Sequence, residues 1–186
     1  MFESLLARHA HALDAAGLPY MVFGGQAVLL HGEPRLTQDI DVTLGADPSR
    51  LGAALGVVQA LGLTPLVDPE PFVAETYVLP CVESATGIRL DLVFSNEGYE
   101  RTAIARTVTA RVGGADVRFA SVEDLLVQKL VAGRPRDLED ARGVLNRHPD
   151  ADAGYVRRWL SEFDAALGTG AAPAFDRLLT DGSEPL

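Results

Sequence analysis

The chain has 186 residues, 47% of them hydrophobic, which allows one ordinary domain with a small additional part and a core large enough to fold alone. Its formal net charge of −10 argues against a broad electrostatic grip on nucleic acid, because such binding requires many phosphates to be neutralised. The sequence has no apolar run near the ~18 residues of a membrane span and no signal peptide at its start, so we expect a cytoplasmic protein with no membrane partner.

The N-terminal part predicts a helix over residues 2–16, a strand over residues 20–23 and a tight turn at Gly24-Gly25 that opens a second, short helix. Glycines between a strand and a helix let the backbone approach a ligand closely. The exposed N–H groups of the helix start favour a phosphate. By itself this pattern is also that of an ordinary turn. A loop over residues 32–37, which carries Arg35, leads into the next strand.

That strand contains two aspartates one residue apart, in the run Gln38-Asp39-Ile40-Asp41-Val42-Thr43-Leu44. Side chains alternate faces along a strand, so Asp39 and Asp41 point to one face and the apolar residues to the other. Two carboxylates so close repel each other and raise a pKa unless a cation compensates. A divalent metal ion with oxygen ligands is the natural candidate.

The middle of the chain predicts a helix over residues 48–61, then a proline-rich loop followed by a strand within residues 63–82. The strand over residues 88–94 is the second one interrupted by charge. Its apolar residues form the core face, which leaves Arg89 and Asp91 on the other face. If the two interrupted strands are neighbours, Asp91 stands beside Asp39 and Asp41. A lone charge in such a strand is more often only a solvated residue.

The remaining chain predicts a short helix and a hairpin, followed mainly by helices. The expected elements are the helix 98–106, the hairpin 107–112 and 115–119, and helices over 121–132, from Pro135 onwards and over 152–167. Ser121 is the expected N-cap of the first of these last three helices, and Lys129 falls on its apolar stripe, so its side chain points inward or along a cleft wall. We therefore expect a core over residues 1–119, a helical subdomain over residues 120–168 and a loosely held tail over residues 169–186.

Three strand carboxylates and a glycine turn at a helix start are the parts of a metal–triphosphate site, as nucleotidyl transfer requires. The ordered motifs Gly24-Gly25, Asp39-Ile40-Asp41 and Asp91 resemble those of the polymerase-β-like nucleotidyltransferase superfamily. The wider run to His31-Gly32 and Arg35-Leu36-Thr37 looks most like the AbiEii-type nucleotidyltransferases, the toxins of type IV toxin–antitoxin systems. In that group a later lysine precedes an Arg-Asp segment, which matches Lys129 and residues 136–140.

The resemblance implies an α/β (α+β) fold, with a mixed β-sheet flanked by helices and a C-terminal helical part. It implies a reaction in which an acceptor hydroxyl attacks the α-phosphate of a nucleoside triphosphate and releases pyrophosphate. Two Mg²⁺ ions, or Mn²⁺, would be held by Asp39, Asp41 and Asp91, and Lys129 and Asp137 would complete the catalytic set. The implied nucleotide-binding residues are Gly24, Gly25, Gln26, Arg35, Thr37, Lys129 and Arg134.

The implied acceptor is an RNA, such as tRNA, or a protein, and a cognate antitoxin is a further candidate partner. Within the same chemistry, the acceptor could instead be an aminoglycoside or lincosamide antibiotic, since those nucleotidyltransferases share a similar Gly-Gly to Asp-x-Asp arrangement. A reading from another class is a non-catalytic nucleotide-binding or antitoxin-like partner that keeps the fold. The three acidic residues speak against this last reading.

Overall fold

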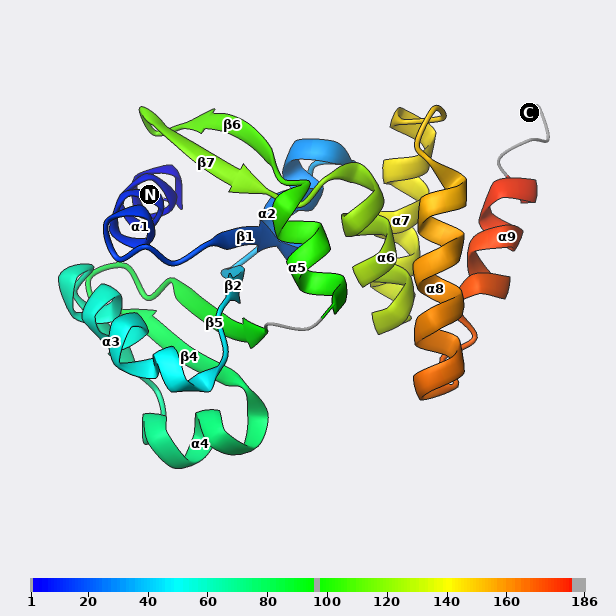
Figure 1. Ribbon diagram of the computed structural model, residues 1–186. Helices are drawn as coiled ribbons and strands as arrows, with labels where there is room; N and C mark the ends of the chain where they lie inside the picture. Colours follow the sequence, from blue (N-terminus) through cyan, green and yellow to red (C-terminus); the bar gives the residue numbers. More distant parts are fainter. Residues whose placement is uncertain (1, 96–97, 182–186) are drawn as a thin grey trace. The chain divides into compact units, whose positions relative to one another are not determined.

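The computed structural model describes residues 2–95 and 98–181 (Figure 1). Its internal contacts divide the chain into two units. Unit 1 comprises Met1–Gln26 and Leu36–Ala120, and unit 2 comprises Ala27–Arg35 and Ser121–Leu186. The expected division at residue 120 therefore differs from the observed one at residues 27–35, which belong to unit 2 although they precede the aspartate strand.

Unit 1 is built on a mixed sheet of seven strands among the described residues, in the order β3-β4-β5-β2-β1-β7-β6. The strands are β1 Tyr20–Phe23, β2 Asp39–Gly45, β3 Leu63–Pro65, β4 Val78–Glu83, β5 Arg89–Ser95, β6 Val108–Val112 and β7 Ala115–Phe119. Strand β2 runs parallel to β5 and antiparallel to β1, and β1 runs parallel to β7. The predicted hairpin is confirmed, since β6 and β7 pair antiparallel around Gly113 and Gly114, both with positive φ.

The helices of unit 1 flank this sheet, which confirms the predicted fold class (Figure 1). They are α1 Phe2–Ala15, the 3₁₀ helix Pro48–Arg50 with α3 Leu51–Ala60, α4 Pro69–Thr76 and α5 Gly98–Ala105. The core lies on the apolar face of the central strands, where Ile40, Val42 and Leu44 of β2 are fully buried. The alternation in β2 therefore turns its aspartates to the other face.

Unit 2 is helical in its described part. It contains α6 Val122–Ala132, α7 Pro135–Arg147, α8 Ala153–Leu167 and α9 Ala171–Asp181, and most of α2 Gly24–His31. The predicted cap of α6 is confirmed, because the Ser121 hydroxyl accepts the Asp124 N–H at 3.1 Å. Gly133, with φ of +62°, ends α6 in the left-handed conformation, and Pro135 starts α7.

Two expectations from the middle of the chain are wrong. Residues 69–76 form helix α4 rather than loop and strand, and β4 begins only at Val78. Prolines suggested a loop, but Pro69 and Pro71 both lie in the first turn of α4, where a missing N–H leaves no helical bond unmade. The short strand β3 was missed because its three residues carry too little pattern to be recognised.

The expectation of a loosely held tail does not hold for residues 171–181. They form α9, in which Ala171 and Phe175 are 1% exposed. The glycines and Pro173 suggest a tail, but Ala171, Phe175 and Leu178 recur at helical spacing, and burial of Phe175 within unit 2 stabilises the helix. Residues 182–186 of the expected tail lie outside the described residues. Along residues 2–95 and 98–181, none of the helices combines the length and apolar character that crossing a membrane requires.

Candidate functional site

The glycine turn at the start of α2 packs directly against the aspartate strand. Gly24 has φ of +59°, and a Cβ atom added there would lie 2.0 Å from Oδ2 of Asp41. A Cβ atom on Gly25 would lie 2.3 Å from Oγ1 of Thr37. Any other residue at these two positions would collide with its neighbour, so the turn needs glycine to let Asp41 and Thr37 occupy their places.

The strand register brings the third carboxylate to the first two, as the sequence predicts. In the parallel pair β2–β5, Asp41 lies opposite Asp91, and Asp39 lies opposite Arg89. Opposed residues on neighbouring strands share a face of the sheet, so Asp39, Asp41 and Asp91 belong to one patch. Phe23, the last residue of β1, lies opposite Asp41 on the other side, so the glycine turn begins at the same patch.

Asp91 has an unusual electrostatic environment. Burial raises its pKa, the nearby Arg89 guanidinium lowers it, the Asp39 carboxylate raises it, and the net effect is a pKa above the ordinary value. The Arg89 contact is long, at 3.9 Å between Nη2 and Oδ1. Within the described part of the chain, the buried Oδ1 of Asp91 has no hydrogen-bond partner. This oxygen therefore lacks the hydrogen-bond donor that a buried carboxylate normally requires, and its ion pair with Arg89 is a long one.

Two predicted nucleotide-binding side chains contact the first aspartate. The Thr37 hydroxyl donates to Oδ1 of Asp39 at 2.9 Å. The side-chain amide of Gln26 is buried and donates to the backbone carbonyl of Asp39 at 3.3 Å. These contacts orient Asp39 and tie the start of β2 to α2, so both side chains support the carboxylate patch in this structure.

The carboxylates fit a hard divalent cation in their chemistry. Among residues 2–95 and 98–181, no three His, Cys, Asp or Glu side chains converge into a finished metal-ion cluster. The three aspartates nevertheless offer only oxygen donors, which Mg²⁺ prefers. A bound cation would supply the partner that Oδ1 of Asp91 lacks. It would also lie near Asp41, whose carboxylate packs closely against Gly24.

The remaining predicted site residues lie in unit 2 and form one ion-pair network. Lys129 is 6% exposed, and its Nζ lies 2.8 Å from Asp137 and 2.9 Å from Asp140. Arg35 holds Asp140 with two hydrogen bonds, from Nε at 2.9 Å and from Nη2 at 3.0 Å. Arg134 holds Asp137 from Nε at 2.5 Å and from Nη2 at 3.3 Å. Three cations thus share two buried carboxylates.

This network determines the ionisation of Asp137. Burial alone would raise its pKa, but hydrogen bonds from Arg134 and Lys129 outweigh burial and hold the pKa below the ordinary value. Asp140, which is not among the residues predicted for the site, links Lys129 to Arg35. Its spacing of three residues from Asp137 on one helix face was the available signal.

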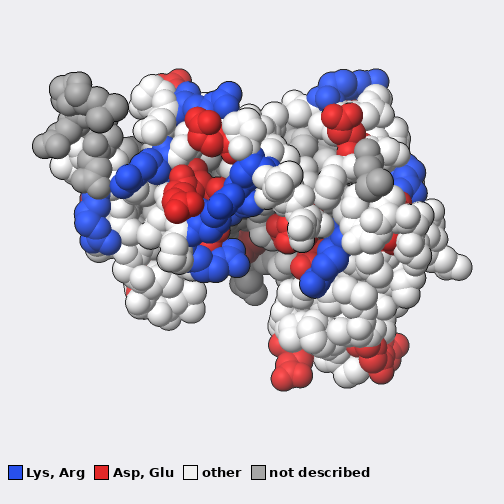
Figure 2. All heavy atoms as spheres, turned by 180° about the vertical axis from the view of Figure 1, so that it is seen from behind, with Lys and Arg blue, Asp and Glu red and all other residues white. Residues whose placement is uncertain are grey.

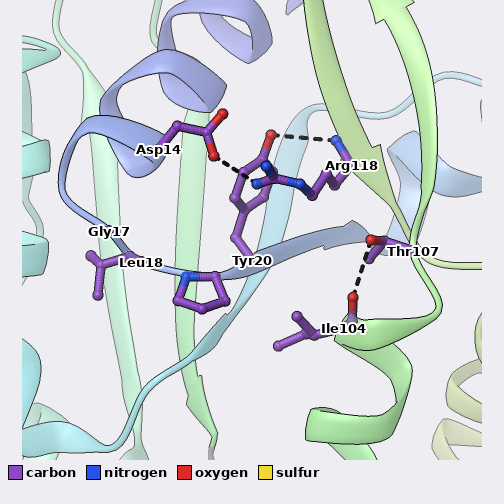
Figure 3. A pocket seen from close by; sticks show the side chains of 8 residues that line it. Asp14, Gly17, Leu18, Tyr20, Ile104, Thr107 and Arg118 are labelled. Carbon is purple, nitrogen blue, oxygen red and sulfur yellow. Dashed lines mark hydrogen bonds and ion pairs between the residues drawn. The ribbon is translucent and has the colours of Figure 1, made fainter.

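A second feature of unit 1 is a cavity of about 380 Å³ near the start of β1 (Figure 3). Its charged groups pair with one another, since Arg118 contacts Asp14 at 2.6 Å and stacks on the Tyr20 ring. The Tyr20 hydroxyl accepts the Arg118 backbone N–H at 3.3 Å. The Thr107 hydroxyl donates to the Ile104 carbonyl. The Arg118–Asp14 pair therefore joins β7 to α1, and the Thr107 hydroxyl closes the end of α5.

The charged surface is mixed rather than uniform on the face in Figure 2, where Lys and Arg lie next to Asp and Glu. Exposed pairs such as Arg111–Asp116 and Arg157–Asp176 show this pairing in both units.

Comparison with known proteins identifies a family. A family model described as "Nucleotidyltransferase of unknown function (DUF6036)" matches residues 4–150. No curated protein sequence matches the chain.

Solved structures with a similar fold are nucleotidyltransferases or resemble them. An antigenic nucleotidyltransferase-like protein from Paracoccidioides brasiliensis is 15% identical with a TM-score of 0.58, and the match covers 94% of this chain and 91% of that one. ANT(2″)-Ia in complex with adenylyl-2″-tobramycin is 20% identical with a TM-score of 0.60, over 89% of this chain and 98% of that one. The lincosamide antibiotic adenylyltransferase LnuA is 15% identical with a TM-score of 0.50, over 71% and 89%.

Proposed function

The chain belongs to the nucleotidyltransferase family DUF6036, and from this premise we propose that it moves a nucleoside monophosphate from a nucleoside triphosphate to a hydroxyl acceptor in a Mg²⁺-dependent reaction. The observation that supports this most is the register of β2 and β5, which sets Asp41 opposite Asp91. The packing of Asp41 over Gly24 adds a helix start suited to phosphate beside the same carboxylate. Family membership also favours an enzyme over a non-catalytic nucleotide-binding partner.

Asp39, Asp41 and Asp91 are the proposed metal ligands. Bound there, two Mg²⁺ ions, or Mn²⁺, would neutralise charge on the reacting phosphate and stabilise the attacking and leaving oxygens. Thr37 and Gln26 act on the carboxylate patch by orienting Asp39. Asp91 is also the carboxylate proposed to assist removal of the proton from the acceptor hydroxyl.

In unit 1, the backbone at Gly24 and Gly25 is a proposed phosphate contact. Unit 2 carries proposed phosphate contacts of its own, which are basic side chains. Arg35 and Arg134 are the proposed phosphate contacts, because guanidinium groups suit phosphate geometry. Lys129 contributes positive charge to the network, and Asp137 orients it through the 2.8 Å ion pair. The group Arg35, Lys129, Arg134, Asp137 and Asp140 carries three positive and two negative charges, so it is attractive to phosphate as a whole.

The acceptor has two candidate classes. The resemblance to AbiEii-type toxins supports a hydroxyl of an RNA, such as tRNA, or of a protein, with a cognate antitoxin as partner. The acidic net charge of −10 and the fold shared with ANT(2″)-Ia support a cationic aminoglycoside as the second candidate.

Replacement of one metal ligand tests the reaction. Asp41→Asn removes a charge from the patch with little change in shape, and we expect nucleotide incorporation to fall by at least about 10²-fold. Asp68→Asn is the matched control, because Asp68 is exposed and makes no side-chain cap bond to α4, so activity should stay unchanged. Both variants are checked for folding by circular dichroism. Incorporation by Asp41→Asn at the wild-type rate rejects the proposed chemistry.

The acceptor is identified with α-phosphate-labelled nucleoside triphosphates, each offered with tRNA, total protein or an aminoglycoside panel. Label in RNA or protein that depends on Asp41 supports the toxin-like function. Label only in an aminoglycoside assigns the second candidate.

A further inference from the structure

Tyr77 has a backbone conformation that tyrosine rarely adopts. It caps the C-terminus of α4 with φ of +61° and ψ of +17°, the left-handed region. Of the residues that the structure describes, it is the one non-glycine with positive φ. Its N–H donates to Val73 at 2.9 Å, and its carbonyl accepts the Phe94 N–H at 2.8 Å, which hold it in place. A bulky side chain in this region is strained, and glycine would be the ordinary choice.

Packing of the Tyr77 ring does not offset the energetic cost of this backbone strain. Tyr77 as a whole residue is 52% exposed, so the ring gains little from burial. Its hydroxyl has no hydrogen-bond partner in the part of the chain that the structure describes. Strain that stability does not explain is a reason to look for a ligand, because such residues gather at binding sites.

The ring lines a pocket of about 490 Å³, a volume that suits a small molecule. The pocket lies where α4, the end of β5 and the segment after β2 meet, all within unit 1. Phe94 and Ala74 give it apolar walls, and Ser49 and Ser95 add hydroxyl groups. It is distinct from the carboxylate patch, because Asp41 and Asp47 are separated by most of β2, about 20 Å of extended chain.

The charge in the pocket comes from Asp47. Its Oδ1 accepts the Ser49 N–H at 2.9 Å, and the Ser49 hydroxyl and N–H lower its pKa, as Arg50 does to a smaller degree. The carboxylate is therefore ionised at neutral pH. Asp47 and Tyr77 both line this pocket, and a carboxylate and an aromatic ring are two groups that attract an ammonium ion.

We propose that this pocket binds a small organic ammonium ion with an apolar body, held by the carboxylate of Asp47 and the ring of Tyr77. Phe94 and Ala74 contact the apolar body, and the strained backbone of Tyr77 sets the ring at the pocket. The proposal does not depend on the proposed nucleotidyl transfer, and its test does not measure that activity.

The test compares two probes of the same shape, benzylamine and neutral benzyl alcohol, by titration of the ¹⁵N-labelled protein in NMR spectra. We expect benzylamine to shift the amide signals of Asp47, Ser49, Tyr77 and Ser95 with saturation. Its affinity should exceed that of benzyl alcohol by about tenfold. Equal affinities, or shifts that do not include these residues, overturn the proposal.

Two variants distinguish a specific role of the Asp47 carboxylate from a general effect of net charge. Asp47→Asn keeps an acceptor for the Ser49 N–H and should lose the preference for benzylamine, whereas Glu75→Gln, an equal charge change at an exposed position on α4, should retain it. Equal losses in the two variants mean that only net charge matters and reject the site.

Tyr77→Gly gives a signature that misfolding cannot imitate. It relieves the strained conformation, so Tm should rise by about 2–4 °C while benzylamine affinity falls by about tenfold. Tyr77→Phe keeps the ring and should retain the affinity. Unchanged binding by Tyr77→Gly overturns the role of the ring.

Discussion

Lys129 illustrates how the environment of one residue changes its expected role. The sequence places it on the apolar stripe of a helix, and the structure buries it between Asp137 and Asp140. A lysine held by two carboxylates acts first on those carboxylates, and its contact with a triphosphate stays a prediction. Because Asp137 and Asp140 in turn hold Arg134 and Arg35, loss of Lys129 affects the whole network.

Lys129→Met should therefore destabilise the protein. It leaves two buried carboxylates with less compensating charge, and we expect the free energy of unfolding to fall by about 3 kcal/mol. Arg111→Met is the matched control, because the Arg111–Asp116 pair is exposed and should contribute only about 0–1 kcal/mol. Urea denaturation measures both. A loss for Lys129→Met as small as for the control contradicts the buried network.

His9 makes stability depend on pH. It is 1% exposed in α1, and burial lowers its pKa from 6.5 to about 3. The unfolded chain binds a proton at His9 more readily than the folded protein does. The free energy of unfolding is therefore highest above the unfolded pKa of His9, and it decreases as pH falls towards the folded pKa. Between pH 7.5 and pH 5 the loss should reach about 2 kcal/mol.

The contribution of His9 is measured by urea denaturation at both pH values. His9→Gln cannot take up a proton and should flatten the dependence in this window. His11→Gln, on the exposed side of the same helix, should leave it unchanged. An unaltered pH dependence in His9→Gln contradicts the assignment.

At the scale of elements, the glycine turn at the start of α2 and strand β2 depend on each other, because Gly24 leaves the space that Asp41 occupies. Gly24→Ala would place a Cβ atom 2.0 Å from Oδ2 of Asp41 and strain a backbone with φ of +59°. We expect nucleotide incorporation to fall by about 10²-fold, because a metal ligand is displaced. Gly56→Ala in α3 meets open space and should raise stability by about 0.5–1 kcal/mol without loss of activity. Full activity of Gly24→Ala contradicts the proposed role of the turn.

Elements with a strong local pattern were predictable, and those stabilised from outside were not. The alternation in β2 and β5, the glycines of the β6–β7 hairpin and the Ser121 cap are local features, and all appear where the sequence predicts them. The prolines before β4 predict a loop, but Pro69 and Pro71 lie at the start of helix α4, because proline is also compatible with the first turn of a helix. Helix α9 lies in a stretch whose glycines and proline suggest a tail, and the helical spacing of Ala171, Phe175 and Leu178 is the local signal that indicates it.

At the scale of the whole molecule, binding of metal and nucleotide should appear as stability. A ligand that binds only the folded protein raises its stability by about 2.7 kcal/mol at a hundredfold excess over Kd, so Tm should rise with Mg²⁺ and an α,β-methylene nucleoside triphosphate. Removal of the metal with EDTA should abolish the shift. Asp41→Asn should show little shift, whereas Asp68→Asn should behave as the wild type. An equal shift in Asp41→Asn and the wild type contradicts metal binding by the patch.

The sequence by itself determined which carboxylates share a face of a strand, where glycine is required and where a capped helix such as α6 begins, because these features depend on a few neighbouring residues. Only the tertiary structure decided that β5 lies beside β2 with Asp91 opposite Asp41, since strand pairing joins segments far apart in the chain. The tertiary structure also decided that Arg35 pairs with Asp140 and that Lys129 lies in the same ion-pair network. Burial and long-range pairing act through space, and a linear pattern does not contain them.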